Sequence, residues 1–235
     1  SSTGTYDVSV TATSGQIYFN NGGDKAKLLD VKQWGTCKWT SMQAASRGCS
    51  NMVSTAIDTA NTSNVSRCDY AFESGRVCNG DISGWNFSNV TKIIQMFQNA
   101  RAFNQDLSSW NVSNVTRLDG VFYNSILFNQ PIGGWSKSNV TDMDVMFYDA
   151  QSFNQDISSW DINQVSHFSI FMATATGLST ANYDALLIAW DAQGTMSYSG
   201  TVNFGGSTYT LGGAAEAART SLISKWGGII DGGGV

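Results

Sequence analysis

A set of apolar positions recurs along the middle of the chain with a period of 25 residues. The most regular columns consist of tryptophan and phenylalanine, and between them the words SNVT and FNQD recur. A fixed period of this length is typical of repeat proteins, whose units bury their apolar faces only against their neighbours. The columns are Trp85, Trp110, Trp135 and Trp160; Phe72, Phe97, Phe122 and Phe147; and Phe103, Phe128 and Phe153.

Within one repeat, the apolar spacing predicts a short helix followed by a short strand. Ile93, Met96, Phe97 and Ala100 follow the i, i+3, i+4, i+7 spacing of one helical face. Residues 103–107 alternate apolar and polar side chains, which is typical of a strand. We therefore expect an α/β solenoid, a right-handed coil like a leucine-rich repeat, built of short parallel strands and short helices.

The two flanks depart from the period and predict a different structure at each end. We expect residues 1–35 to form a β-rich N-terminal cap, with two strands over Tyr6–Asn20. About five repeats span residues 36–176, and an α+β C-terminal cap spans 177–235. Within that second cap the pattern predicts a helix at 179–190, a hairpin at 202–211 around Gly205-Gly206, a helix at 214–226 and a strand at 229–230.

The repeat and its flanks resemble a known family of bacterial surface proteins. The words WNVSNVT (110–116) and FNQDISSW (153–160) are similar to the 25-residue repeat of proteins related to BspA-like leucine-rich repeats. The lead-in at 33–52 and the segment LSTANYDALLIAW (178–190) resemble the family's flanking segments. The segment TGTYDVSV (3–10) resembles the end of a longer β-rich unit, and the resemblance implies that residues 1–35 are the remnant of that upstream unit. The resemblance implies a secreted or surface-anchored protein, in some members one that adheres to host proteins or other cells. It implies no catalytic residue.

Composition narrows the classes of partner. Charged residues make up only 13% of the chain, and the net charge of −5 argues against a nucleic-acid partner. No apolar run approaches the length of about 20 residues that a membrane span needs. Polarity comes instead from Ser, Thr and Asn, much of it from the repeat itself. We expect a secreted or cell-surface location, which rests more on the resemblance than on composition.

Candidate catalytic chemistry is sparse. His167 is the single histidine, and no nucleophile-elbow, zinc-protease or phosphate-loop motif occurs. We therefore predict no enzyme and no cofactor. The column Asp81, Asp106 and Asp156, which Pro131 interrupts, leaves an Asp-based glycosidase as the remaining enzymatic alternative. The same column is a weak Ca²⁺ candidate, or each Asp accepts backbone N–H groups within its own turn.

Three further sets of residues each have two interpretations. The unbroken asparagine column either bridges successive repeats as a ladder or binds a ligand. The tryptophan column either packs in the core or offers a platform to carbohydrate. The cysteines either form disulfides, with Cys68–Cys78 and Cys37–Cys49 as one of three pairings, or stay as buried thiols. The asparagines are Asn79, Asn104, Asn129 and Asn154, and the cysteines are Cys37, Cys49, Cys68 and Cys78.

Variable columns of the repeat are the candidate ligand contacts. They change chemistry from one repeat to the next while the apolar columns stay constant. The predicted function is therefore a binding or adhesion module for a protein or glycan on another cell or matrix. The alternative is a structural subunit or spacer of a surface layer, fibre or appendage, for which self-assembly is needed. The variable columns are Arg67, Lys92, Arg117, Asp142 and His167, and Arg101, Ile126 and Gln151.

Overall fold

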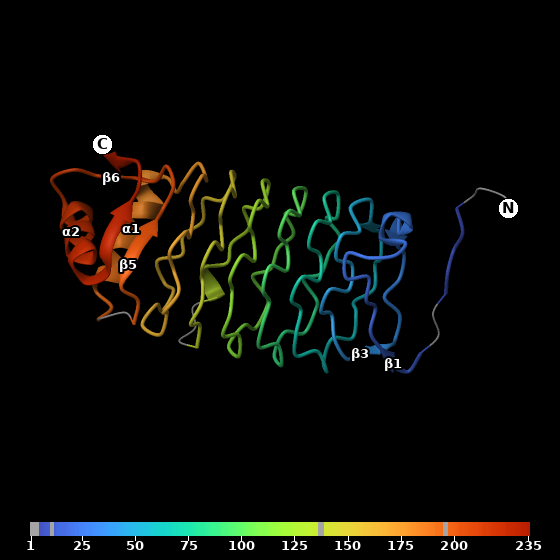
Figure 1. Ribbon diagram of the computed structural model, residues 1–235. Coiled ribbons are helices and arrows are strands. Elements are labelled where there is room, and N and C mark those ends of the chain that lie inside the picture. The colour runs from blue at the N-terminus through green and yellow to red at the C-terminus, as the bar shows by residue number, and fades with distance from the viewer. Residues whose placement is uncertain (1–4, 10–11, 136–138, 195–196) are drawn as a thin grey trace.

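The computed structural model describes residues 5–9, 12–135, 139–194 and 197–235. Figure 1 shows an elongated molecule in which successive repeats lie side by side as irregular loops. Residues 5–9 lie away from one end of the repeats, and the helices α1 (Thr180–Asp191) and α2 (Ala214–Trp226) lie at the other. In place of the two strands predicted over Tyr6–Asn20, the described part of that segment contains the single short strand β1 (Ser14–Gly15), and residues 10 and 11 lie outside the described ranges. The domain limits at residues 35 and 176 stay a prediction.

The predicted α/β solenoid of short helices and parallel strands is wrong. The described residues contain two α-helices, α1 (Thr180–Asp191) and α2 (Ala214–Trp226), and both follow the repeats. Short 3-10 turns occur at η1 (Lys25–Lys27) and η2 (Gly133–Trp135). Strands occur in two-stranded parallel sheets, β1 with β3, β2 with β4, β5 with β7 and β6 with β8. The further strands are β2 (Asp30–Val31), β3 (Lys38–Trp39), β4 (Val53–Ser54), β5 (Gly200–Asn203), β6 (Thr208–Tyr209), β7 (Gly227–Ile230) and β8 (Gly233–Gly234).

Two residues with a left-handed backbone conformation explain why the predicted helix at 93–100 does not form. Gln95 has a φ of 51° and Asn99 a φ of 59°, and each ends a right-handed turn after a few residues. The backbone N–H of Gln95 therefore donates to the carbonyl of Asp119 in the next repeat, at 2.9 Å, instead of to its own segment. The helical spacing of apolar residues thus arises from a chain that changes handedness every four residues.

Side-chain hydrogen bonds explain why the predicted strand at 103–107 does not form. The backbone N–H of Asn104 donates to Oδ1 of Asn79 at 2.8 Å, where a strand would need a backbone carbonyl. Asn129 and Asn154 donate in the same way to the asparagine one repeat earlier, both at 2.9 Å. The last link runs from the N–H of Ser179 to Asn154 at 2.8 Å. The asparagine side chains therefore bridge the repeats and reach the start of α1.

Aromatic rings fill the interior of the repeats. Phe97 and Phe122 stack with ring centroids 5.8 Å apart, and Phe122 and Phe147 with 5.6 Å. Trp110 and Trp135 are 4% and 2% exposed, and each indole N–H donates at 3.1 Å to a carbonyl of the preceding repeat. The packing interpretation of the tryptophan column is therefore confirmed, and these rings are not available as a carbohydrate platform.

The C-terminal region agrees with the sequence in its helices. The predicted helices are confirmed by α1, where Oγ of Ser179 accepts the N–H of Asn182, and by α2, which ends at the left-handed Gly227. The strand predicted at 229–230 is confirmed as part of β7. No helix in the described ranges is both long and apolar enough to cross a bilayer.

The hairpin predicted at 202–211 is wrong. Its two arms, β5 and β6, pair in parallel with β7 and β8 and not with each other. Gly205 and Gly206 instead allow close backbone contact with the last repeat. A Cβ added to Gly205 would lie 2.6 Å from the carbonyl oxygen of Met172, and one added to Gly206 would lie 2.5 Å from that of Thr176. The glycine pair therefore serves packing against the repeats, which the sequence pattern does not distinguish from a turn.

Candidate binding face

One side of the repeats is held together by a regular ladder of backbone hydrogen bonds. Isolated parallel bridges join residues 67, 92, 117, 142 and 167 in succession. Beyond each bridge, alternate N–H groups donate to the next repeat, as Leu118, Gly120, Phe122 and Asn124 do to Asp142, Asp144, Met146 and Tyr148 at 2.7–2.9 Å. We call the outward-pointing residues of segments 67–74, 92–99, 117–124, 142–149 and 167–174 the ladder face. Their backbone is fixed by the ladder, so their side chains are presented at a constant spacing.

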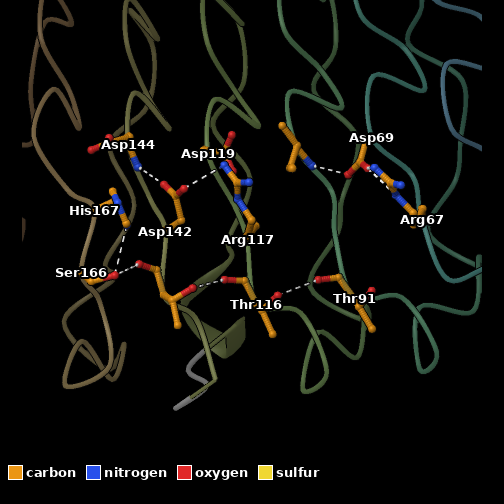
Figure 2. A network of polar contacts seen from close by, with 12 residues as sticks. Arg67, Asp69, Thr91, Thr116, Arg117, Asp119, Asp142, Asp144, Ser166 and His167 are labelled. Carbon is orange, nitrogen blue, oxygen red and sulfur yellow. Dashed lines mark hydrogen bonds and ion pairs between the residues drawn. The ribbon is translucent and has the colours of Figure 1, made fainter. Parts of the chain in front are cut away.

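The first predicted ligand column lies at one edge of the ladder face. Arg67 and His167 are exposed, Lys92 and Arg117 are half-buried, and Asp142 is buried. The structure therefore brings these five residues into one row, although they differ in exposure. Figure 2 shows four of them with the polar groups around them.

Ion pairs neutralise much of this row. Arg67 pairs with Asp69, whose carboxylate is fully buried, at 2.6 Å. Arg117 pairs with Asp119 at 3.0 Å and with Asp142 at 2.9 Å (Figure 2). Although burial alone would lower it, the two carboxylates raise the pKa of Arg117. Burial, with the nearby charge of Asp142, raises the pKa of Asp119. These side chains therefore bind mainly one another.

Lys92 and His167 differ from the rest of the row. In the repeat of Lys92, Ile94 occupies the position that Asp69 and Asp119 hold in theirs, and no ion pair to Lys92 occurs in the described part of the chain. The Nδ1 atom of His167 lies 3.1 Å from Oγ of Ser166 (Figure 2). Among the described residues, these two are the members of the row that form no ion pair.

The second predicted column follows the ladder face at its other edge. Arg101 is exposed, and Ile126 and Gln151 are half-buried. The amide of Gln151 donates to the carbonyl of Thr174 at 2.7 Å and accepts from Thr176 at 2.8 Å. The two predicted columns are therefore not adjacent to each other, because the ladder face separates them.

Sequence reasoning missed the side chains at the centre of the ladder face. Tyr123 and Tyr148 are half-buried and stack with ring centroids 4.6 Å apart and an interplanar angle of 7°. Val145 is half-buried, and Ile170 is 43% exposed. The signal that was available is the 25-residue spacing of the two tyrosines, which have glutamate and glutamine at the equivalent earlier positions.

Each aspartate of the weak Ca²⁺ candidate lies in a turn of its own repeat. Asp81, Asp106 and Asp156 each accept the backbone N–H of the serine two residues later, at 2.8–2.9 Å. For Asp106, the hydrogen bond from the backbone of Ser108 is the main cause of a lowered pKa. No group of three His, Cys, Asp or Glu residues suited to a metal occurs in the ranges that the structure describes.

Comparison with known proteins gives a family for this arrangement. A family model described as "Mycoplasma protein of unknown function, DUF285" matches residues 16–125 and 107–203. The chain belongs to this family. The two matched segments overlap and together cover the repeats, α1 and β5. No curated protein and no solved structure matches the chain.

The cysteines of this DUF285 chain require a correction. Cys37, Cys49, Cys68 and Cys78 are all free, so neither expected disulfide is present. Cys68 and Cys78 occupy the interior positions that Ile93 and Phe103 hold one repeat later, and they pack there as small apolar side chains. Burial raises the pKa of the Cys78 thiol to about 11, so that side chain is neutral at pH 7.

Proposed function

We propose that the chain is a secreted or cell-surface binding module that recognises a protein or glycan ligand through its ladder face. The observation that carries the proposal is a contrast within each repeat. The ladder repeats its backbone hydrogen bonds from one repeat to the next. The outward position at residues 70, 95, 120, 145 and 170 nevertheless carries Tyr, Gln, Gly, Val and Ile. A constant backbone with changing outward side chains is how repeat proteins adapt one surface to a particular ligand.

The family context agrees with this proposal. The DUF285 match covers the repeats, and the repeat wording resembles that of BspA-like surface proteins. We infer that the chain is related to those proteins and shares their surface location and adhesive role. The polar surface of Ser, Thr and Asn agrees with an extracellular address. The proposed ligand is a protein or glycan on another cell or matrix, and the proposal involves no nucleic acid, cofactor or catalytic step.

The proposal is tested with the purified chain on a panel of extracellular-matrix proteins and on a glycan array. A ladder-face variant carries Lys92→Ala, Tyr123→Ser, Tyr148→Ser and His167→Ala. A matched control carries Gln164→Ala, an exposed residue outside the ladder face. We expect at least one ligand that binds the native chain and the control but not the ladder-face variant, with circular dichroism showing that all three are folded. A ligand bound equally by all three, or no ligand on either panel, contradicts the proposal.

A structural role is the second candidate, and the open sheet edges favour it. In the described ranges β1 and β2 pair on one side only, as do β7 and β8 at the other end. Unpaired strand edges at both ends offer backbone groups to a second copy of the chain. Sedimentation velocity over a wide concentration range tests this candidate. Growth of the chain into larger species is expected if it is right, and a monomer at the highest concentration rules it out.

A further inference from the structure

Four apolar and aromatic side chains lie on the ladder face across three neighbouring repeats. We call Tyr123, Val145, Tyr148 and Ile170 the aromatic patch. The hydrogen bond from Asn124 N–H to the Tyr148 carbonyl, at 2.7 Å, and the bridge between Asp142 and His167 hold these repeats in register. Ile170 is 43% exposed, and the other three side chains are half-buried. The patch is therefore accessible to a partner and is part of a rigid backbone.

Val145 has a backbone conformation that does not suit its side chain. Its φ is 51°, in the left-handed region, and the equivalent residue one repeat earlier is Gly120, with a φ of 63°. A β-branched residue is strained there, whereas glycine adopts that region freely. Because Val145 is only half-buried, the core gains little from it. The left-handed backbone is common to this position of the repeat, since Tyr70 and Gln95 have φ values of 60° and 51°, and Val145 is its β-branched member. A β-branched side chain kept at a strained, half-buried position is a candidate contact for a partner.

The surroundings of the aromatic patch are acidic. Segments 117–124 and 142–149 contain four carboxylates, Asp119, Asp142, Asp144 and Asp149, and one guanidinium, that of Arg117. Asp144 directly precedes Val145, and Asp149 directly follows Tyr148. Arg117 is already paired with Asp119 and Asp142. The patch therefore lies in a field of net negative charge, which attracts cationic partners and repels anionic ones.

We propose that the aromatic patch docks a protein segment in which an apolar side chain is flanked by Lys or Arg. The apolar side chain packs against Val145, Ile170 and the tyrosine edges, and the basic side chains lie beside Asp144 and Asp149. This inference rests on the proposed binding function and chooses protein over glycan. The two tyrosine rings stack on each other, at 7°, so one face of each ring is closed to a sugar ring. An acidic glycan is further disfavoured by the charge.

The probes are two synthetic peptides, acetyl-KLKFKLK-amide and its charge-reversed form acetyl-ELEFELE-amide, titrated into the full chain by calorimetry. We expect saturable binding of the basic peptide that weakens at high salt, and none of the acidic peptide. Asp149→Asn removes one carboxylate and places asparagine at a position whose φ of 54° it tolerates. It should weaken binding of the basic peptide by about fivefold.

The decisive variant is Val145→Gly, because it relieves backbone strain while it removes the contact. It should lose about tenfold in affinity for the basic peptide and melt at the same temperature as the native chain or higher. Ile188→Ser, on the exposed side of α1, is the control and should bind normally. Equal binding of both peptides, no binding, or full affinity in Val145→Gly overturns this inference. The panel of matrix proteins and glycans tests the broader function separately, since a glycan ligand there would keep that function and exclude this one.

Discussion

The middle repeats and the N-terminal region both have an aromatic core, but the stack of rings is continuous in the first and interrupted in the second. Around Phe122 the aromatic stack is continuous, and Trp110 and Trp135 each bond to the preceding repeat. Around Ser46, which lies where the later repeats have phenylalanine, the stack is interrupted. An apolar cavity there is lined by Trp34, Met42, Ser46, Phe72 and Trp85, among others. The comparison shows that the phenylalanine column fills the interior and that a cavity remains where it is interrupted.

The tryptophan N–H groups show the same difference. The indole N–H groups of Trp34, Trp39 and Trp85 are buried without a partner in the described part of the chain. Trp110 donates to the carbonyl of Ile82, and the equivalent residue one repeat earlier is Ile57, whose side chain is fully exposed. The segment before Trp85 therefore departs from the repeat path, and its acceptor is lost. A buried, unpaired N–H is costly, so the N-terminal region is the less stable part.

The largest expected effect comes from breaking the complete stack. Phe122→Ala leaves a cavity inside a stack of fully buried rings, so we expect a loss of about 3–5 kcal/mol in the free energy of unfolding. Phe72→Ala, beside the existing cavity, should cost less. Urea denaturation followed by tryptophan fluorescence measures both. Equal losses, or a greater loss for Phe72→Ala, would contradict the difference between the two regions.

The next effect separates paired from unpaired indole groups. Trp135→Phe removes an N–H that donates to the Leu107 carbonyl, and Trp85→Phe removes an N–H without a partner. Both substitutions lose similar volume. We expect Trp135→Phe to cost about 1–2 kcal/mol more than Trp85→Phe in the same denaturation assay. A larger loss for Trp85→Phe would show that its N–H has an acceptor in solution.

A smaller effect of opposite sign is expected from filling the cavity. Ser46→Leu places apolar volume in the N-terminal cavity and should raise the free energy of unfolding by about 1 kcal/mol, net of the Ser46 hydrogen bond to Ala71. The control is Ser125→Leu, at a fully buried serine in the complete region, which should destabilise by about 1–3 kcal/mol. If both substitutions raised the free energy of unfolding, or both lowered it, the assignment of the cavity would be refuted.

The smallest effect concerns the reactivity of the four cysteine thiols, and it needs no substitution. Cys37 is partly exposed, whereas Cys49, Cys68 and Cys78 are buried. Burial raises the pKa of Cys49 and Cys78 to about 11 from an unfolded value near 9. Because the folded chain holds these protons more tightly, their contribution to the free energy of unfolding is complete below pH 9 and is lost as the pH rises towards 11.

We expect one thiol to react with a disulfide reagent at pH 8 in the folded chain and four after unfolding. Fewer than four after unfolding would reveal a disulfide.

Sequence reasoning found the repeats and their interior because apolar columns at a fixed period arise when each repeat buries its apolar face against the next. It predicted the helix at 179–190 from the Ser179 N-cap and one apolar face, and the helix at 214–226 from a run of helix-forming residues. It failed at 93–100 because Gln95 is not a residue type that indicates a left-handed backbone. The row of Arg67 to His167 was found because its charges vary. The aromatic patch was missed because Val145 and Ile170 do not differ from core residues in sequence alone.

The account is tested most directly by Val145→Gly, measured for both thermal stability and calorimetric binding of acetyl-KLKFKLK-amide. If the backbone of the ladder face is fixed by its hydrogen bonds and its side chains contact a partner, the variant melts no lower than the native chain and binds about tenfold more weakly. A variant that melts lower and retains full affinity would show that Val145 serves the fold and that the partner binds elsewhere.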